Sequence, residues 1–283
     1  MRHLRGLAPL APAYDGFILD LWGVIHDGVR PYPGAVDCLR ALRAAGKRAV
    51  LLSNAPRRAE PVREQLRGMG IEDALYDGVM TSGEATHLVL RDRPDPWYAA
   101  LGRRVFHLGP ERDRNVIAGL DLALVDDPAA ASFLLNTGPD DHLDPTDPAA
   151  FDPVLRACAD AGLPMICANP DLEVIRGGVR VVCAGTLAQR YAAMGGDVRS
   201  LGKPDPAIYG PVLDALGTER ARVLAVGDAL RTDIAGAAAA GVDSCWVLGG
   251  LHGEHLGEGA AGIEAEAARA GLHPVATVPH FVW

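Results

Sequence analysis

The chain has 283 residues, of which 49% are apolar, and a formal net charge of −9. This length accommodates one large domain, or a domain with a second one inserted into it. No apolar run approaches the ~20 residues that a membrane span needs, and no basic cluster could follow the phosphates of a polynucleotide. We therefore expect neither a membrane protein nor a partner of nucleic acid.

The N-terminal stretch and the cysteines indicate where in the cell the protein is located. The opening stretch "MRHLRGLAPLAPAYDG" has no sustained apolar segment, so we expect no signal peptide. The five cysteines are scattered, and any disulfide scheme leaves at least one of them over. This usage is typical of a reducing environment, so we expect a cytoplasmic protein.

Strand-like and helix-like stretches alternate from the N-terminus onward. "FILD" (17–20) reads as a buried strand that ends on an acid, and it is followed by a helix over 35–46, a strand over 48–54 and a helix over 59–70. The same alternation returns near the other end, with a strand over 222–228, a helix over 232–241 and a strand over 243–250. It predicts an α/β fold with a Rossmann-like parallel sheet and helices on its faces.

The middle of the chain has strands and a helix of its own. These are strands over 104–109, 132–138 and 164–169 and a helix over 149–162. Because the polar strand ends resume only after this stretch, we expect an inserted α/β cap domain. The expected division is 1–84 for the first part of the core, 85–188 for the cap and 189–283 for the second part of the core.

Polar side chains follow three of the apolar strands. In parallel sheets, ligands bind at the carboxyl ends of the strands, and these ends share one edge of the sheet. We therefore expect one cluster there, formed by Asp20, Ser53, Lys203 of "GKPDP", and Asp228 and Asp233 of "GDALRTD".

Several carboxylates and one lysine in a single cleft suggest a hard divalent cation. Mg²⁺ prefers oxygen ligands and usually takes one or two carboxylates plus phosphate oxygens of a substrate. Asp228 could reach such an ion directly, while Asp233 lies in the first turn of the following helix, where the helix dipole favours a negative charge. Phosphoryl transfer depends mainly on positioning and charge neutralisation, so the cluster predicts that chemistry on a small phosphorylated substrate.

The order DxxGV, SN, GKP and GDxxxTD resembles the haloacid dehalogenase superfamily. The inserted stretch, with "PYPGA" (31–35) and "CANPD" (167–171), is similar to subclass IIA, which carries an α/β cap and includes NagD-like nucleotide phosphatases and p-nitrophenyl phosphatases. The resemblance covers nearly the whole chain, and its four motifs are specific together although each is weak alone. It implies a Mg²⁺-dependent phosphatase. The oligomeric state stays open between a monomer and a homodimer, although caps of this type often take part in dimer contacts in relatives.

The resemblance also implies a role for each matching residue. Asp20 would be the nucleophile that forms an aspartyl-phosphate, Lys203 would bridge Asp20 and the phosphate, and Ser53 would hydrogen-bond the phosphoryl group with Asn54 beside it. Asn169 and Asp171 would lie in a cap loop that helps to select the substrate, although both could simply build a turn. The metal ligands would be Asp20, the backbone carbonyl of Trp22, Asp228 and, directly or through water, Asp233.

Trp22 departs from the pattern of the superfamily. Its phosphatases usually carry DxD, where the second aspartate protonates the leaving group and later activates water. An indole is only a hydrogen-bond donor and can do neither. His26 or Asp27 could substitute, but both are expected in a turn on the exposed surface; Asp171 is a further candidate.

Two other functions stay open beside the phosphatase. A haloacid dehalogenase also carries an aromatic residue two positions after its nucleophile, but it needs no metal, and the acids of "GDALRTD" would repel one another without a cation. A phosphatase-derived binding or regulatory protein is compatible with Trp22, whereas the intact nucleophile, lysine and metal acids argue against it.

Overall fold

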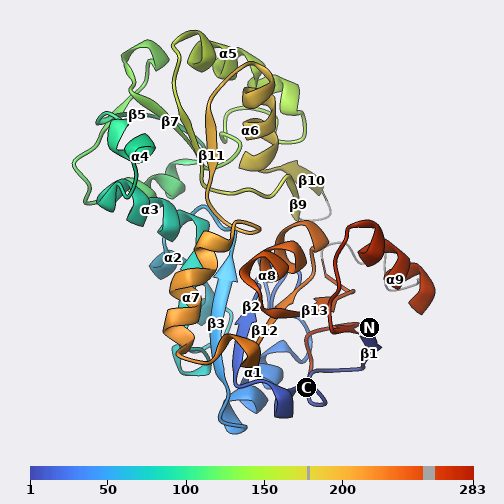
Figure 1. The fold of residues 1–283 in the computed structure, drawn as a ribbon. Coiled ribbons are helices and arrows are strands. Elements are labelled where there is room, and N and C mark those ends of the chain that lie inside the picture. The colour runs from blue at the N-terminus through green and yellow to red at the C-terminus, as the bar shows by residue number, and fades with distance from the viewer. Residues whose placement is uncertain (177–178, 251–258) are drawn as a thin grey trace. The chain divides into compact units, whose positions relative to one another are not determined.

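Buried apolar strands alternate with helices along the chain in the computed structural model, which describes residues 1–176, 179–250 and 259–283 (Figure 1). The residues group into two units. The first comprises Met1–Ser53, Val62–Met80 and Lys203–Trp283, and the second comprises Asn54–Pro61 and Thr81–Gly202. The insert expected over 85–188 falls within the second unit; its limits as a domain stay a prediction.

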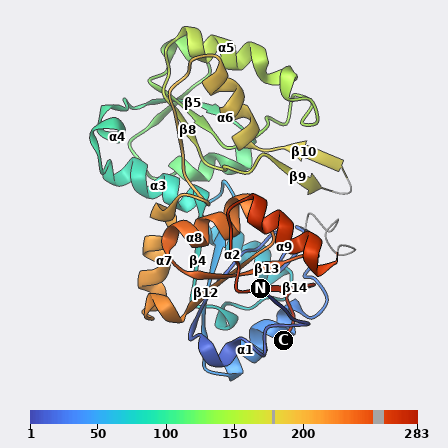
Figure 2. The same ribbon diagram turned by 45° about the vertical axis from the view of Figure 1, so that its right-hand side comes forward.

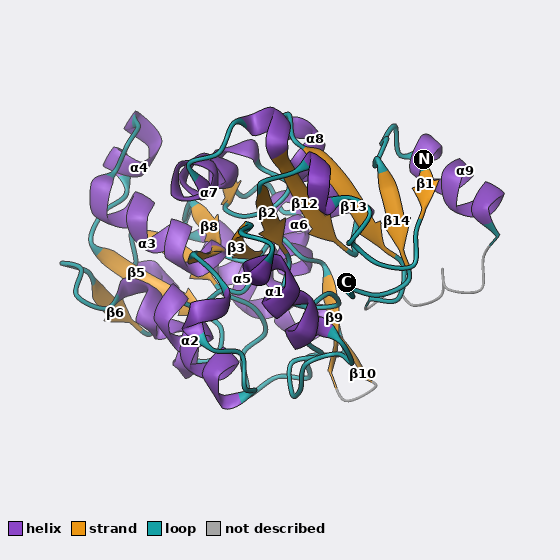
Figure 3. Ribbon diagram, turned by 90° about the horizontal axis from the view of Figure 1, so that it is seen from below, coloured by secondary structure: helices purple, strands orange, loops and turns teal. Residues whose placement is uncertain are grey.

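A seven-stranded sheet forms the centre of the first unit, in the order β1-β14-β13-β12-β2-β3-β4. Each strand from β1 through β14, β13, β12 and β2 to β3 pairs in parallel with the next one in this order. Figure 3 shows α7 and α8 on one face of this sheet and α1 and α2 on the other. The strands are β1 (Arg2–His3), β2 (Gly16–Leu19), β3 (Arg48–Ser53), β4 (Gly78–Thr81), β12 (Val223–Gly227), β13 (Asp243–Val247) and β14 (Ala276–Val278). The helices are α1 (Ala35–Ala44), α2 (Ala59–Gly68), α7 (Tyr209–Leu216), α8 (Ala235–Ala240) and α9 (Ala260–Arg269).

The central strands are buried along their whole length. Every residue of β2 and β12 is buried, as expected for parallel strands covered by helices on both faces. The chain departs from the predicted helix 232–241 at its start, because a π-helical turn, Leu230–Ile234, precedes α8. Such turns occur frequently at functional sites, and this one contains Asp233.

The second unit is built on a five-stranded parallel sheet in the order β11-β8-β7-β5-β6. Successive residues of β7 pack on opposite faces: Leu134 joins a cluster with residues of α5 and α6, whereas Phe133 and Leu135 join one with residues of α3 and α4. The same two helix pairs are seen in Figure 2. The strands are β5 (Arg104–Leu108), β6 (Ala123–Val125), β7 (Phe133–Asn136), β8 (Met165–Cys167) and β11 (Val198–Ser200), with an antiparallel pair β9 (Glu173–Arg176) and β10 (Val179–Val182). The helices are α3 (Ser82–Asp92), α4 (Pro96–Ala100), α5 (Asp152–Asp160) and α6 (Ala184–Ala193).

Among the helices of the described ranges, none combines the length and apolar content needed to cross a bilayer.

Candidate active site

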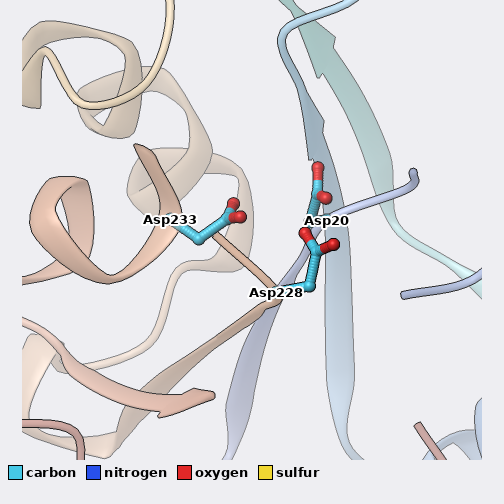
Figure 4. A group of neighbouring side chains, drawn as sticks. All are labelled: Asp20, Asp228 and Asp233. Carbon is cyan, nitrogen blue, oxygen red and sulfur yellow. The ribbon is translucent and has the colours of Figure 1, made fainter. Parts of the chain in front are cut away.

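Three carboxylates and one ammonium are buried at the carboxyl ends of β2 and β12. Asp20 directly follows β2 and Asp228 directly follows β12, and these two strands are neighbours in the sheet. The exposed fractions are 7% for Asp20, 3% for Lys203, and 5% for both Asp228 and Asp233. Figure 4 shows the carboxylates of the three aspartates gathered together, and their ligand oxygens lie within 4.8 Å of one another. The convergence expected from the parallel topology is therefore present.

The Lys203 ammonium donates three hydrogen bonds inside this cluster. Its Nζ lies 2.5 Å from Oδ1 of Asp20, 2.7 Å from Oδ1 of Asp233 and 3.1 Å from the carbonyl oxygen of Leu52. An ammonium has three protons to donate, so these bonds fix its position and direction. Lys203 thereby joins the ends of three separate segments of the first unit.

The Asp233 carboxylate is held from both of its oxygens. Oδ1 accepts from Lys203, and Oδ2 accepts from the backbone N–H of Ala229 at 3.1 Å. A Cβ on Gly227 would lie 2.1 Å from Cβ of Asp233, so only glycine allows this close approach. Each oxygen thus accepts a hydrogen bond, and the two bonds together fix the direction of the carboxylate.

These four side chains comprise three carboxylates and one ammonium, so the cluster has an excess of carboxylates. The ammonium forms ion pairs with Asp20 and Asp233, and a buried charge is costly unless it is compensated. Burial raises the pKa of Asp20 well above its usual range, the neighbouring Asp233 carboxylate raises it further, and Lys203 acts in the opposite direction. A divalent cation would offset the excess, and the all-oxygen donor set is the kind that Mg²⁺ accepts. The residues present therefore fit a magnesium ion.

Ser53 ends β3, the neighbour of β2 on its other side. Its side chain is buried, and it lies at the same edge of the sheet as Asp20. This position agrees with the predicted phosphate-binding role, which stays a prediction.

The Trp22 indole packs against two later residues of its own loop, His26 and Gly28. The Trp22 and His26 rings pack edge to face with centroids 5.5 Å apart. Gly28 has φ of +92° and approaches the indole so closely that a Cβ there would lie 2.2 Å from Cη2 of Trp22. The indole is thus held by its own loop.

The expectation that His26 is exposed is wrong, because this side chain is only 2% exposed. Its Nδ1 accepts the backbone N–H of Gly28 at 3.0 Å, so the imidazole serves to close the loop. Asp27 Oδ1 accepts the N–H groups of Arg30 and Val29, and these bonds hold the pKa of Asp27 below its usual range. A carboxylate that is already ionised cannot donate a proton, which makes Asp27 a poor substitute acid.

The expected substrate loop lies in the second unit, where it forms a small polar network. Nδ2 of Asn54 donates to Oδ1 of Asp171 at 2.9 Å, and Oδ1 of Asn169 accepts the N–H of Asp171 at 3.1 Å. Asn169 thus builds a turn, which is the alternative that its sequence left open. A role of these three side chains in choosing a substrate stays a prediction.

Sequence reasoning missed the groups that position the charged side chains. The carbonyl of Leu52 and the N–H of Ala229 are backbone atoms, which no side-chain pattern reveals. Gly227 left a signal in "VGD", since a glycine directly before a strand-end acid indicates a close approach.

A parallel sheet with an acidic, lysine-containing cluster at its carboxyl edge is the architecture of an α/β enzyme. Residues 17–123 match a family model described as haloacid dehalogenase-like hydrolase, and residues 200–275 match one described as HAD-hydrolase-like. The chain belongs to the haloacid dehalogenase-like hydrolases, as its motifs predict.

Individual proteins agree with this assignment. Chronophin of Rattus norvegicus is 30% identical over 82% of this chain and 76% of its own length. The D-glycerol 3-phosphate phosphatase of Mycobacterium tuberculosis is 32% identical over 86% of this chain and 65% of its own. The crystal structure of a haloacid dehalogenase-like hydrolase from Brucella suis is 32% identical, has a TM-score of 0.85 and covers 99% of this chain and 100% of that one. The predicted α/β fold class is thereby confirmed.

Proposed function

We propose that the protein is a Mg²⁺-dependent phosphoric monoester hydrolase that acts on a small phosphorylated metabolite through an aspartyl-phosphate on Asp20. The observation that carries the proposal is the buried cluster in which Lys203 bonds Asp20 and Asp233 while Asp228 lies beside them. Burying these charged side chains removes them from water and lowers the stability of the fold. A role in binding or catalysis explains why they are buried together. The phosphatase named among the relatives supports the reaction class.

In the proposed reaction, a carboxylate oxygen of Asp20 attacks the phosphorus of the substrate. The bond from phosphorus to the leaving oxygen breaks, and its electron pair departs with that oxygen. Water then attacks the phosphorus of the aspartyl-phosphate, and the bond from phosphorus to the Asp20 oxygen breaks, which restores the carboxylate. The attacking water loses a proton to solvent as inorganic phosphate forms, and the departed oxygen takes its proton from solvent. Mg²⁺, held by Asp20, the Trp22 carbonyl and Asp228, would neutralise phosphate charge and orient the phosphoryl group.

Lys203 holds the nucleophile in place before the substrate arrives. Its ammonium opposes the rise that burial causes in the pKa of Asp20, and its second contact, to Asp233, holds the ammonium beside the nucleophile. Ser53, at the end of the next strand, would donate its hydroxyl proton to another phosphoryl oxygen. Fixed charges and donors of this kind stabilise a transition state because they need no reorganisation.

Trp22 sets the expected preference among substrates. Positioned acid–base catalysis contributes roughly 10²–10⁴ in rate, and neither the indole nor Asp27 is suited to supply it. Substrates whose leaving groups need little protonation, such as aryl and acyl phosphates, should therefore react best.

The decisive experiment is a screen of phosphorylated metabolites and aryl phosphates, with Mg²⁺ and with a chelator, on the wild type and the Asp20→Asn variant. Asp37→Asn, a change on the surface of α1, serves as the matched control. Phosphate release that needs both Mg²⁺ and Asp20 is the expected result. Release by Asp20→Asn at the wild-type rate would overturn the proposal.

Two further assays separate the alternatives. A regulatory protein is compatible with Trp22, and trapping of beryllium fluoride on Asp20 without turnover of any phosphate ester would indicate that function. Metal-independent release of halide from a haloacid would indicate a dehalogenase.

The compartment and the assembly belong to the proposal as well. All five cysteines are buried and none forms a disulfide, which supports a reducing, cytoplasmic compartment. We propose a homodimer from the family resemblance alone, and sedimentation equilibrium tests it.

A further inference from the structure

The indole of Trp246 contacts the backbone of the proposed metal ligand Asp228. Trp246 lies in β13, directly beside Gly227 of β12. Its side chain is 1% exposed, and its Nε1–H donates to the carbonyl oxygen of Asp228 at 2.8 Å. Buried indoles usually find an acceptor for this proton, but here the acceptor is the peptide group that carries the metal ligand.

The carboxylate of Asp228 is confined from another direction by Gly250. A Cβ on Gly250 would lie 2.2 Å from Oδ2 and 2.3 Å from Cβ of Asp228. Gly250 follows β13 by three residues, so the segment that carries Trp246 also carries this second contact. The backbone of Gly250 does not have a positive φ, so the crowding by Asp228 is what excludes a side chain.

We propose that Trp246 and Gly250 are positioning residues for the metal site, which together fix the direction of the Asp228 carboxylate. The indole holds the peptide on the C-terminal side of Asp228, so the backbone from which the carboxylate projects cannot rotate. Because Gly250 has no Cβ, the Asp228 carboxylate can lie directly against its Cα, and this contact limits the directions in which the carboxylate can point. This inference rests on the proposed function, because it concerns a ligand of the proposed magnesium site.

The physical reason is preorganisation of a ligand. Partners that hold a metal ligand in place typically contribute 10–100-fold to metal affinity. Without the indole, the Asp228 carbonyl loses a buried hydrogen bond and its peptide can turn. The carboxylate would then have to be reoriented each time the metal binds.

The test measures binding of Mn²⁺ alone, with free Mn²⁺ counted by its electron paramagnetic resonance signal. Trp246→Phe removes the N–H but keeps most of the ring, and Gly250→Ala pushes against the carboxylate. Each should weaken Mn²⁺ binding by about tenfold or more. Thermal unfolding and near-ultraviolet circular dichroism show whether each variant is folded.

Two matched controls separate positioning from general loosening. Ile263→Ala removes packing from the cluster that contains Trp246, but Ile263 has no polar group. Gly249→Ala introduces a Cβ 2.5 Å from the carbonyl oxygen of Pro279 and 2.6 Å from the His280 ring. Its steric clash is therefore similar to that of Gly250→Ala, but it does not involve Asp228. Both controls should bind Mn²⁺ as the wild type does.

The outcomes are distinct. Wild-type affinity in Trp246→Phe and Gly250→Ala, or equal weakening in the two controls, overturns the positioning role while the proposed function stands. No Mn²⁺ binding by the wild type, or undiminished binding by Asp228→Asn, overturns the metal site and this inference with it. If Trp246→Phe does not fold, the comparison of Gly250→Ala with Gly249→Ala decides alone.

Discussion

Nζ of Lys203 lies 2.5 Å from Oδ1 of Asp20, although the two residues are 183 positions apart in the chain. Both side chains are buried, and the same ammonium reaches the carbonyl of Leu52 and the carboxylate of Asp233. A compact point charge can lie among three acceptors in this way. The geometry leads to the first prediction, because the larger cation of arginine has a different shape.

Lys203→Arg should lower kcat by about 10² or more, the order of loss seen when one preorganised group is removed from an active site. A planar guanidinium requires a wider, forked site and cannot occupy the point where the three acceptors meet. Steady-state kinetics on an aryl phosphate measure the effect. The control is Lys47→Arg, since Lys47 is the other lysine of the chain and bonds Asp15 at 3.1 Å away from the cluster. Near-normal turnover in Lys203→Arg would contradict the role given to this residue.

Asp228→Asn should lose Mg²⁺ affinity and activity together. The amide keeps the shape of the carboxylate but removes the negative charge on which a hard cation depends. Calorimetric titration with Mg²⁺ and the rate of phosphate release are the two measurements. Should activity fall while Mg²⁺ still binds with wild-type affinity, Asp228 would not be a metal ligand.

Trp22→Asp should raise hydrolysis of alkyl phosphates by more than that of aryl phosphates. The new carboxyl group would restore an acid at the position that the superfamily's phosphatases use, and alkyl leaving groups need a proton most. The ratio of kcat/KM for the two substrate types is the measurement. Because the indole packs against Gly28 and His26, its removal can leave a cavity. Thermal unfolding and Mg²⁺ binding must therefore show that the variant keeps its fold and site. A folded, metal-binding variant without the selective gain would mean that another residue, with Asp171 as the first candidate, already supplies the proton.

The stability of the protein should fall between pH 6.5 and pH 4 through His107. Burial, reinforced by the charge of Arg114, lowers the pKa of His107 from 6.5 to about 4. Above pH 6.5 the imidazole is neutral in both the folded and the unfolded chain. Between the two pKa values only the unfolded chain takes up the proton, so the free energy of unfolding drops as the pH falls, by roughly 3 kcal/mol in all.

His107→Gln tests this prediction, because glutamine does not titrate and can still bond Thr137, the partner of the His107 ring. Urea midpoints at pH 7 and pH 5 should differ less in His107→Gln than in the wild type. The exposed His273 provides the control, and His273→Gln should keep the wild-type difference. An unchanged pH dependence in His107→Gln would show that the acid sensitivity arises elsewhere.

The sequence alone was sufficient to predict the α/β fold and the gathering of Asp20, Ser53 and Asp228 at one edge of the sheet. Parallel strands end at a common edge, and the apolar runs show where each strand ends, so polar residues at those ends must meet. The family of the protein followed from the same residues, because the order and spacing of the four motifs are a property of the chain itself.

Only the tertiary structure decided how these side chains are held. His26 lies in a turn, where exposure is the usual outcome, but packing against Trp22 buries it. Trp246 reads in the sequence only as one apolar residue of the buried strand "DSCWVLGG"; its contact with Asp228 depends on the register between β12 and β13. Local patterns report periodicity and strand ends. Strand register, burial and the hydrogen bonds between distant segments arise only when the whole chain packs. The same local sequence pattern is therefore compatible with many different registers and contacts.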